Sequence, residues 1–279
     1  MRKVRERFEP LTYVDIDSSL YQVIKIMTLK RSLAIGVKKN DRNLMKVLTI
    51  RDVLKYLIRP RESLNKLLSK DVSFFIKRPR YYTTHSAELI TLINLIRDMK
   101  YYRLIFVIHE KRKFPIGFLR INELIKLFNY LRSSWYNILS EERYVIKEPI
   151  ISSNTTMKGC IRRLLESNST IAIVHRKGKV LGVVDVFNIL NCLISEDTSK
   201  YIARGNDDYF YYTTCSTVMS KDFDFLSESD DIEDMYDFLE NYGYLLVLKN
   251  SKSKVLSKFI SNGSAFSILK RLLKSGIIV

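Results

Sequence analysis

A threonine and an aspartate three residues apart, Thr49 and Asp52, stand where an apolar strand of the sequence gives way to a helix. Residues 45–49 favour a strand, and residues 52–58 continue with apolar side chains at helical spacing. Both side-chain oxygens can therefore face one point above the strand end, toward which the first backbone N–H groups of the helix also point. That point suits a phosphate or a ribose, and Arg51 adds a cation beside it. The same spacing also fits a plain helix cap, in which Asp52 only charges the first turn.

The pattern around Thr49 recurs four times along the chain. Each unit has an apolar strand, an amphipathic helix, a strand hairpin and a closing helix, which predicts an α/β (α+β) fold of β-α-β-β-α repeats. The first strands of the four units are predicted at 11–14, 80–84, 149–151 and 216–220. The positions equivalent to Thr49 are Arg120, Asp185 and Ser261, at steps of 71, 65 and 76 residues.

These units resemble cystathionine-β-synthase (CBS) domains over essentially the whole chain. The most specific signals are Val47-Leu48-Thr49-Ile50-Arg51-Asp52, Leu181-Gly182-Val183-Val184-Asp185 and Val218-Met219-Ser220. The resemblance implies four CBS repeats paired into two pseudo-twofold modules, a basic one at 1–140 and a charge-neutral one at 141–279. It also implies clefts for adenine nucleotides or related adenosyl ligands. In such clefts the aspartate holds the ribose hydroxyls and the threonine faces the phosphate.

Only the first repeat keeps both residues of that pattern. The corresponding pairs are Arg120 and Glu123, Asp185 and Asn188, and Ser261 and Ser264. A carboxylate at the phosphate position repels the ligand and a serine pair lacks the ribose carboxylate, so the second module is not expected to bind nucleotide. Arginine can still take a phosphate in bidentate fashion. The expected nucleotide-binding residues are Thr49, Arg51, Asp52, Arg120 and Glu123. AMP, ADP, ATP or a related adenosyl ligand is then an optional cofactor, not an obligatory one.

The excess positive charge of the chain belongs to its first half. Residues 1–140 carry 29 lysines and arginines against 12 acids, whereas residues 141–279 carry 18 of each, so the whole net charge of +17 lies before residue 141. A field of this sign attracts polyanions such as nucleic acid, an anionic membrane face or an acidic protein. Residues 222–240 are acidic instead, and are expected to face solvent or protein.

Basic residues of the first half alternate with tyrosines. This combination suits RNA, because guanidinium groups bind phosphates while unpaired bases stack on rings; such tyrosines are also common as half-buried strand residues. The expected RNA-binding residues are Arg2, Lys3, Arg5, Arg7, Lys38, Lys39, Arg42, Lys77, Arg78, Arg80, Tyr81, Tyr82, Tyr102, Arg103, Lys111, Arg112 and Lys113. The expected partner is a ribosomal subunit, as the most abundant structured RNA of a cell. The second module is left for a protein partner or self-association.

The sequence does not indicate an enzyme. Its three histidines and three cysteines form no cluster with metal-ligand spacing and the cysteines lack C-x-x-C spacing, so no metal site is predicted. Phosphate-binding and nucleophile motifs of the Walker, G-x-G-x-x-G and G-x-S-x-G types do not occur. No apolar run reaches the length of a membrane span and the first residues are charged, which favours a cytoplasmic protein without membrane association.

Two functional hypotheses therefore stand. The first is a non-enzymatic regulator that docks on the ribosome and silences translation, with an adenine nucleotide in the first module biasing the docking. The second is a stand-alone adenine-nucleotide sensor that regulates a partner enzyme or transporter, for which the basic face is incidental. A DNA-associated regulator is a third reading, but no helix-turn-helix or zinc motif accompanies the repeats.

Overall fold

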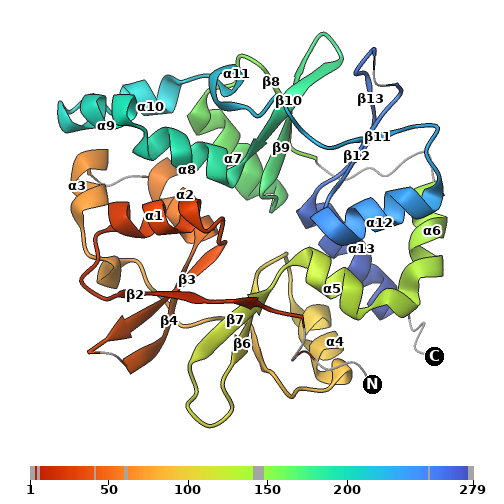
Figure 1. Ribbon diagram of the computed structural model, residues 1–279, viewed down its shortest axis with the longest axis horizontal. Helices are drawn as coiled ribbons and strands as arrows, with labels where there is room; N and C mark the ends of the chain where they lie inside the picture. Colours follow the sequence, from red (N-terminus) through yellow and green to blue (C-terminus); the bar gives the residue numbers. More distant parts are fainter. Residues whose placement is uncertain are drawn as a thin grey trace.

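The computed structural model describes residue 4 and residues 7–40, 42–59, 62–140, 148–250 and 252–275. The four predicted repeats are confirmed as four quarters arranged around the middle of the molecule (Figure 1). In each repeat the first strand runs parallel to its neighbour, and the hairpin that follows is antiparallel. The predicted α/β class is confirmed as well. None of the helices in the described part of the chain is long and apolar enough to span a membrane.

The elements follow one another in the same order in each repeat. The strands are β1 (Glu9–Pro10), β2 (Thr12–Asp15), β3 (Ala34–Lys39), β4 (Arg42–Thr49), β5 (Tyr82–Thr84), β6 (Ile105–Ile108), β7 (Pro115–Leu119), β8 (Ile150–Ser152), β9 (Ile171–Arg176), β10 (Lys179–Asp185), β11 (Leu226–Ser227), β12 (Leu245–Leu248) and β13 (Leu256–Ile260). The repeat helices are α1 (Leu20–Leu29), α2 (Ile50–Ile58), α4 (Leu89–Asp98), α5 (Ile121–Leu127), α7 (Met157–Ser167), α8 (Val186–Ile194), α12 (Ile232–Tyr242) and α13 (Asn262–Lys274). The connections add α3 (Leu64–Ser69), α6 (Arg132–Ser140), α9 (Glu196–Ala203), α10 (Asp208–Tyr212), α11 (Cys215–Val218) and the 3-10 turns η2 (Val72–Phe74) and η3 (Asn129–Leu131).

Neighbouring repeats exchange the segments that precede their first strands. The segment before the first repeat forms β1, which pairs with β7 of the second repeat. The segment before the second repeat pairs through Lys77 with Val47 of β4 in the first. In the other half, Ser220 pairs with Val183 of β10 in the same way. This exchange agrees with the predicted pairing of the first repeat with the second and of the third with the fourth.

The helices join the two halves of the chain. Helices α1 and α2 pack against α8 and α7 in one apolar core, and α4 and α5 pack with α12 and α13 in another. Figure 1 shows these two groups on opposite sides of the molecule. Each core therefore crosses the division predicted at 140/141, where residues 141–147 lie outside the described part. The two sheets of the second half meet in a third cluster of apolar side chains.

Two features of the fold differ from the sequence prediction. The first strand of the fourth repeat was expected at 216–220, but it is β11, which lies parallel to β12; residues 215–218 form the helix α11 instead. The helices between repeats were not predicted. Two of them begin at serine N-caps, because Ser63 and Ser195 accept hydrogen bonds from the amides of Lys66 and Thr198.

Candidate nucleotide-binding cleft

Thr49 ends β4 and caps α2. Its hydroxyl Oγ1 accepts a hydrogen bond from the backbone N–H of Asp52 at 3.2 Å and donates one to Asp52 Oδ2 at 2.7 Å. The other carboxylate oxygen of Asp52, Oδ1, lies 3.2 Å from the ammonium of Lys77. The capping alternative is therefore correct for Thr49, yet it does not exclude the ligand site. Asp52 is held at the end of the strand with its side chain 18% exposed.

A cleft of about 270 Å³ opens above Thr49 and Asp52, and we call it the first cleft. Three repeats contribute to its walls, with residues 47–55 from the first, 77–81 and 102–106 from the second and 165–170 from the third. Its charged residues are Arg51, Lys55, Lys77, Arg78, Arg80, Arg103 and Asp52. Six cations thus face one carboxylate. This imbalance favours an anionic ligand.

Crowding of like charges is visible at the base of the first cleft. Burial, assisted by the nearby Arg103, lowers the pKa of Arg51 to about 10. Burial and the same Arg103 also lower the pKa of Lys55. Arg51 stays protonated at neutral pH and donates through Nη2 to the backbone carbonyl of Leu165, 2.8 Å away in the third repeat. An anion in the cleft would relieve the mutual repulsion of these groups.

The structure brings together residues that the sequence assigned to two different sites. Thr49, Arg51 and Asp52 were expected to bind nucleotide. The first cleft also contains six residues expected to bind RNA, which are Lys77, Arg78, Arg80, Tyr81, Tyr102 and Arg103. The segment exchange is responsible, because the bridge between Val47 and Lys77 places the second repeat's leading segment beside β4.

Two residues expected to bind nucleotide lie elsewhere. Arg120 forms an ion pair with Glu9 and donates to the backbone carbonyl of Arg31 at 2.9 Å, and it lines a different cleft. Glu123 accepts a hydrogen bond from Asn122 and lines neither cleft. Arg120 and Glu123 were expected as the second repeat's counterparts of Thr49 and Asp52, and they lie outside the first cleft, with the arginine paired to Glu9.

Residues expected to bind RNA divide by their exposure. Tyr102 is 7% exposed because it packs against Phe266 of the fourth repeat, so the expectation that its ring stacks on a base at the surface was wrong. Arg7, Lys38, Tyr81 and Arg103 are half-buried. The exposed ones are Lys39, Arg42, Lys77, Arg78, Arg80, Tyr82, Lys111, Arg112 and Lys113. Arg2, Lys3 and Arg5 lie outside the described residues.

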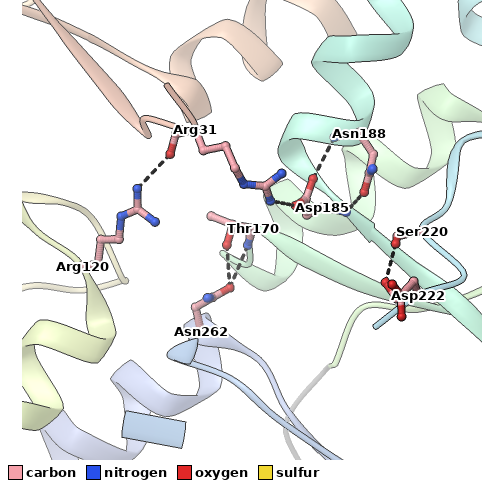
Figure 2. Close-up of polar contacts among 8 residues, drawn as sticks. All are labelled: Arg31, Arg120, Thr170, Asp185, Asn188, Ser220, Asp222 and Asn262. Carbon is pink, nitrogen blue, oxygen red and sulfur yellow. Dashed lines mark hydrogen bonds and ion pairs between the residues drawn. The ribbon is translucent and has the colours of Figure 1, made fainter. Parts of the chain in front are cut away.

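A second cleft of about 440 Å³ lies where all four repeats meet, and Figure 2 shows its polar contacts. Two arginines, Arg31 and Arg120, line it together with three carboxylates, Asp185, Asp222 and Asp224. Arg31 is paired with Asp185 at 2.5 Å, and its guanidinium lies 4.8 Å from the ring centre of Phe187. In the sequence no short motif marks this group, because its members come from distant segments.

In and beside the second cleft, polar side chains of the third and fourth repeats form hydrogen bonds within these two repeats. Asp185 caps α8, accepting from the amide of Asn188 while the Asn188 side chain accepts from the amide of Asp185. Asn262 accepts hydrogen bonds from the amide and the hydroxyl of Thr170 (Figure 2). At the fourth repeat, the amide of Ser261 donates to the carboxylate of Glu148, and burial raises the pKa of that carboxylate.

The comparisons with known proteins agree with this architecture. Residues 4–59 match the family model of the CBS domain. The fold is similar to that of protein MJ1225 from Methanocaldococcus jannaschii, with a TM-score of 0.73, 12% sequence identity and coverage of 96% of this chain and 100% of that one. An uncharacterized conserved protein from Pyrococcus horikoshii covers the same shares of the two chains, with a TM-score of 0.52 and 16% identity. No curated protein matches the chain in sequence.

Proposed function

We propose that this chain, whose residues 4–59 match the CBS-domain model, is a regulatory protein whose first cleft binds an adenine nucleotide. The observation that carries the proposal is the geometry around Asp52. A carboxylate fixed in the first turn of α2 can accept from ribose hydroxyls, while six cations around it can bind phosphates. The cleft is walled by three repeats, so a bound nucleotide would contact both halves of the chain at once. That position is suited to changing how the halves present themselves to a partner.

The test is a calorimetric titration of the full chain with AMP, ADP and ATP, and with the matching guanine and cytosine nucleotides. We expect the adenine nucleotides to bind and Asp52→Ala to weaken them by about 10- to 100-fold, the range for hydrogen bonds to a charged group. Asp17→Ala, which removes an exposed carboxylate outside the cleft, is the matched control. Absence of binding, or equal binding by the Asp52 variant, would contradict the proposal.

A second candidate function is docking on RNA, with a ribosomal subunit as the proposed partner. The observation in its favour is the exposure of Lys39 and Arg42 near one hairpin turn and of residues 111–113 at another. Both hairpins project from the lower edge in Figure 1, opposite to those of the second half. Cations presented side by side on one edge suit a phosphate backbone. The charge-neutral second half remains available for a protein partner, an enzyme or transporter among them.

This candidate predicts co-sedimentation with ribosomal subunits at low salt, abolished by RNase. Changing Lys111, Arg112 and Lys113 to glutamine should weaken binding to single-stranded RNA and lower the slope against log salt by about two. The same change at Lys249, Lys252 and Lys254, on the corresponding turn of the neutral half, is the control. Equal effects of the two triple variants would leave the basic edge without a role in docking.

A further inference from the structure

Lys77 is fixed at its backbone, whereas its side chain is largely exposed. Its amide and carbonyl both hydrogen-bond with Val47 of β4, at 3.0 and 2.8 Å, so its Cα cannot move away from the strand. The side chain is 57% exposed. The ammonium lies 3.2 Å from Asp52 Oδ1 and 5.7 Å from the ring centre of Tyr56. Lys77 therefore covers one oxygen of the carboxylate that a ribose would need.

The cations around Lys77 exceed what one phosphate requires. A phosphate monoester carries a charge of about −2 at neutral pH. Arg51 is already committed to the carbonyl of Leu165, which leaves Lys77 and four further cations that line the cleft. Arg78 and Arg80 are exposed on the same short segment as Lys77. Asp52 is the single carboxylate among all the lining residues, so a monophosphate leaves most of the positive charge unbalanced.

We infer that the first cleft selects a nucleoside polyphosphate over a monophosphate, and that Lys77 is the residue that makes the distinction. The phosphate chain draws the Lys77 ammonium off Asp52, and the freed carboxylate accepts from the ribose. Arg78 and Arg80 bind the phosphates farther along the chain. A nucleoside has no phosphate to bind Lys77, so its ribose hydroxyls must compete with the Lys77 ammonium for Asp52. This inference rests on the proposed function, because it assumes a ribose at Asp52.

The experiment is a set of titrations with adenosine, AMP, ADP, ATP and inorganic triphosphate, in buffer without divalent cations. We expect ATP to bind the unmodified chain about tenfold or more tightly than AMP. Lys77→Gln should weaken the binding of ATP by about tenfold, because one charged hydrogen bond is lost. Adenosine should bind as well as before or better. The double variant Arg78→Gln, Arg80→Gln should reduce ATP affinity about fivefold and leave AMP unchanged, since each exposed charge contributes modestly.

Lys46→Gln is the matched control, because Lys46 is exposed on β4 but does not line the cleft. A melting curve of each variant verifies folding, which these exposed positions should not disturb. If AMP binds as tightly as ATP, or if the double variant weakens both alike, the inference is wrong while the proposed function stands. If inorganic triphosphate binds but adenosine and the adenine nucleotides do not, the proposed function is wrong and no ribose reaches Asp52. Failure of all five compounds to bind rejects both.

Discussion

The two clefts are built from equivalent segments that carry opposite charge. In the first, Val47 of β4 pairs with Lys77; in the second, Val183 of β10 pairs with Ser220. The residues two positions beyond each valine are Thr49 and Asp185. The backbone arrangement is thus the same, but the segment at 77–80 brings three cations, whereas the segment at 220–224 brings two carboxylates to its cleft.

The difference shows that the repeat fixes where a cleft forms and the side chains decide what enters it. In the first cleft Asp52 is the single acid among six cations. In the second, the charges of three carboxylates and two arginines balance each other in part. Asp185, the counterpart of Thr49, is already paired with Arg31. A phosphate would meet repulsion from Asp222 and Asp224 there.

The largest effect is expected at Gly182, which lets Ser220 approach β10. A Cβ at this position would lie 2.3 Å from the Ser220 carbonyl oxygen, which already accepts a hydrogen bond from the amide of Val183. Gly182→Ala should therefore push the segment off the strand and cost about 2 kcal/mol, or roughly 5 °C in melting temperature.

The equivalent residue of β4 is Lys46, which is exposed, so Lys46→Ala is the control and should change the melting temperature little. Thermal unfolding followed by circular dichroism measures both variants. An unchanged melting temperature for Gly182→Ala would mean that the close contact between β10 and Ser220 is not needed for stability.

The charge of the second cleft provides the next test. Replacing Asp222 and Asp224 by lysine gives this segment the sign of its counterpart in the first cleft. We expect inorganic triphosphate to bind the second cleft about tenfold more tightly than before, since each exposed charge contributes up to roughly 1 kcal/mol. Titrations are done in a Lys77→Gln, Arg78→Gln, Arg80→Gln background, which removes three cations from the first cleft and weakens its binding of triphosphate. Lysines at Glu233 and Asp234, exposed and outside both clefts, supply the same charge change as a control. Equal gains would show that overall charge, not the cleft, attracts the anion.

The local parts of this comparison could be predicted from the sequence. The fourfold recurrence of a strand, a helix and a hairpin follows from hydrophobic spacing, and the T-x-x-D spacing placed Thr49 and Asp52 together. Both signals lie within a few residues, where helix and strand geometry fixes the relative positions of side chains. The misplaced first strand of the fourth repeat has a local cause too, because the four residues Cys-Ser-Thr-Val at 215–218 are too few for periodicity to separate a helix from a strand.

The composition of the clefts could not be predicted, because it depends on contacts between distant segments. The exchange that brings Lys77 to Val47 spans 30 positions, and the packing of Tyr102 on Phe266 joins the second repeat to the fourth. Arg31 meets Asp185 across the two halves. Residues expected on an RNA-binding surface therefore turned out to line the cleft of the nucleotide residues.

The fourth repeat offers a pH test, since the amide of Ser261, the counterpart of Thr49, donates to the carboxylate of Glu148. Burial raises the pKa of Glu148 in the folded protein above its ordinary value. The folded state then binds this proton more tightly than the unfolded state, so stability is greatest below the ordinary pKa and falls as pH rises through the raised one. Glu148→Gln should remove that decline while still accepting from the amide of Ser261. Melting temperatures between about pH 4 and pH 8 check it, with exposed Glu166→Gln as the control; parallel curves for the three proteins would refute the expectation.

The smallest effect is expected from Arg31, although its ion pair with Asp185 is the most direct polar link between the halves at the second cleft. The two side chains are 64% and 22% exposed, and an exposed pair of this kind contributes about 0–1 kcal/mol. Arg31→Gln should therefore lower the melting temperature by about 1–2 °C in dilute buffer, and by less when salt screens the pair. Lys30→Gln, an exposed neighbour on the same turn, should lack the salt-dependent part. A fall in melting temperature above about 5 °C would instead mean that Arg31 holds the two halves together. The polar residues of the second cleft would then stabilise the fold and not bind a ligand.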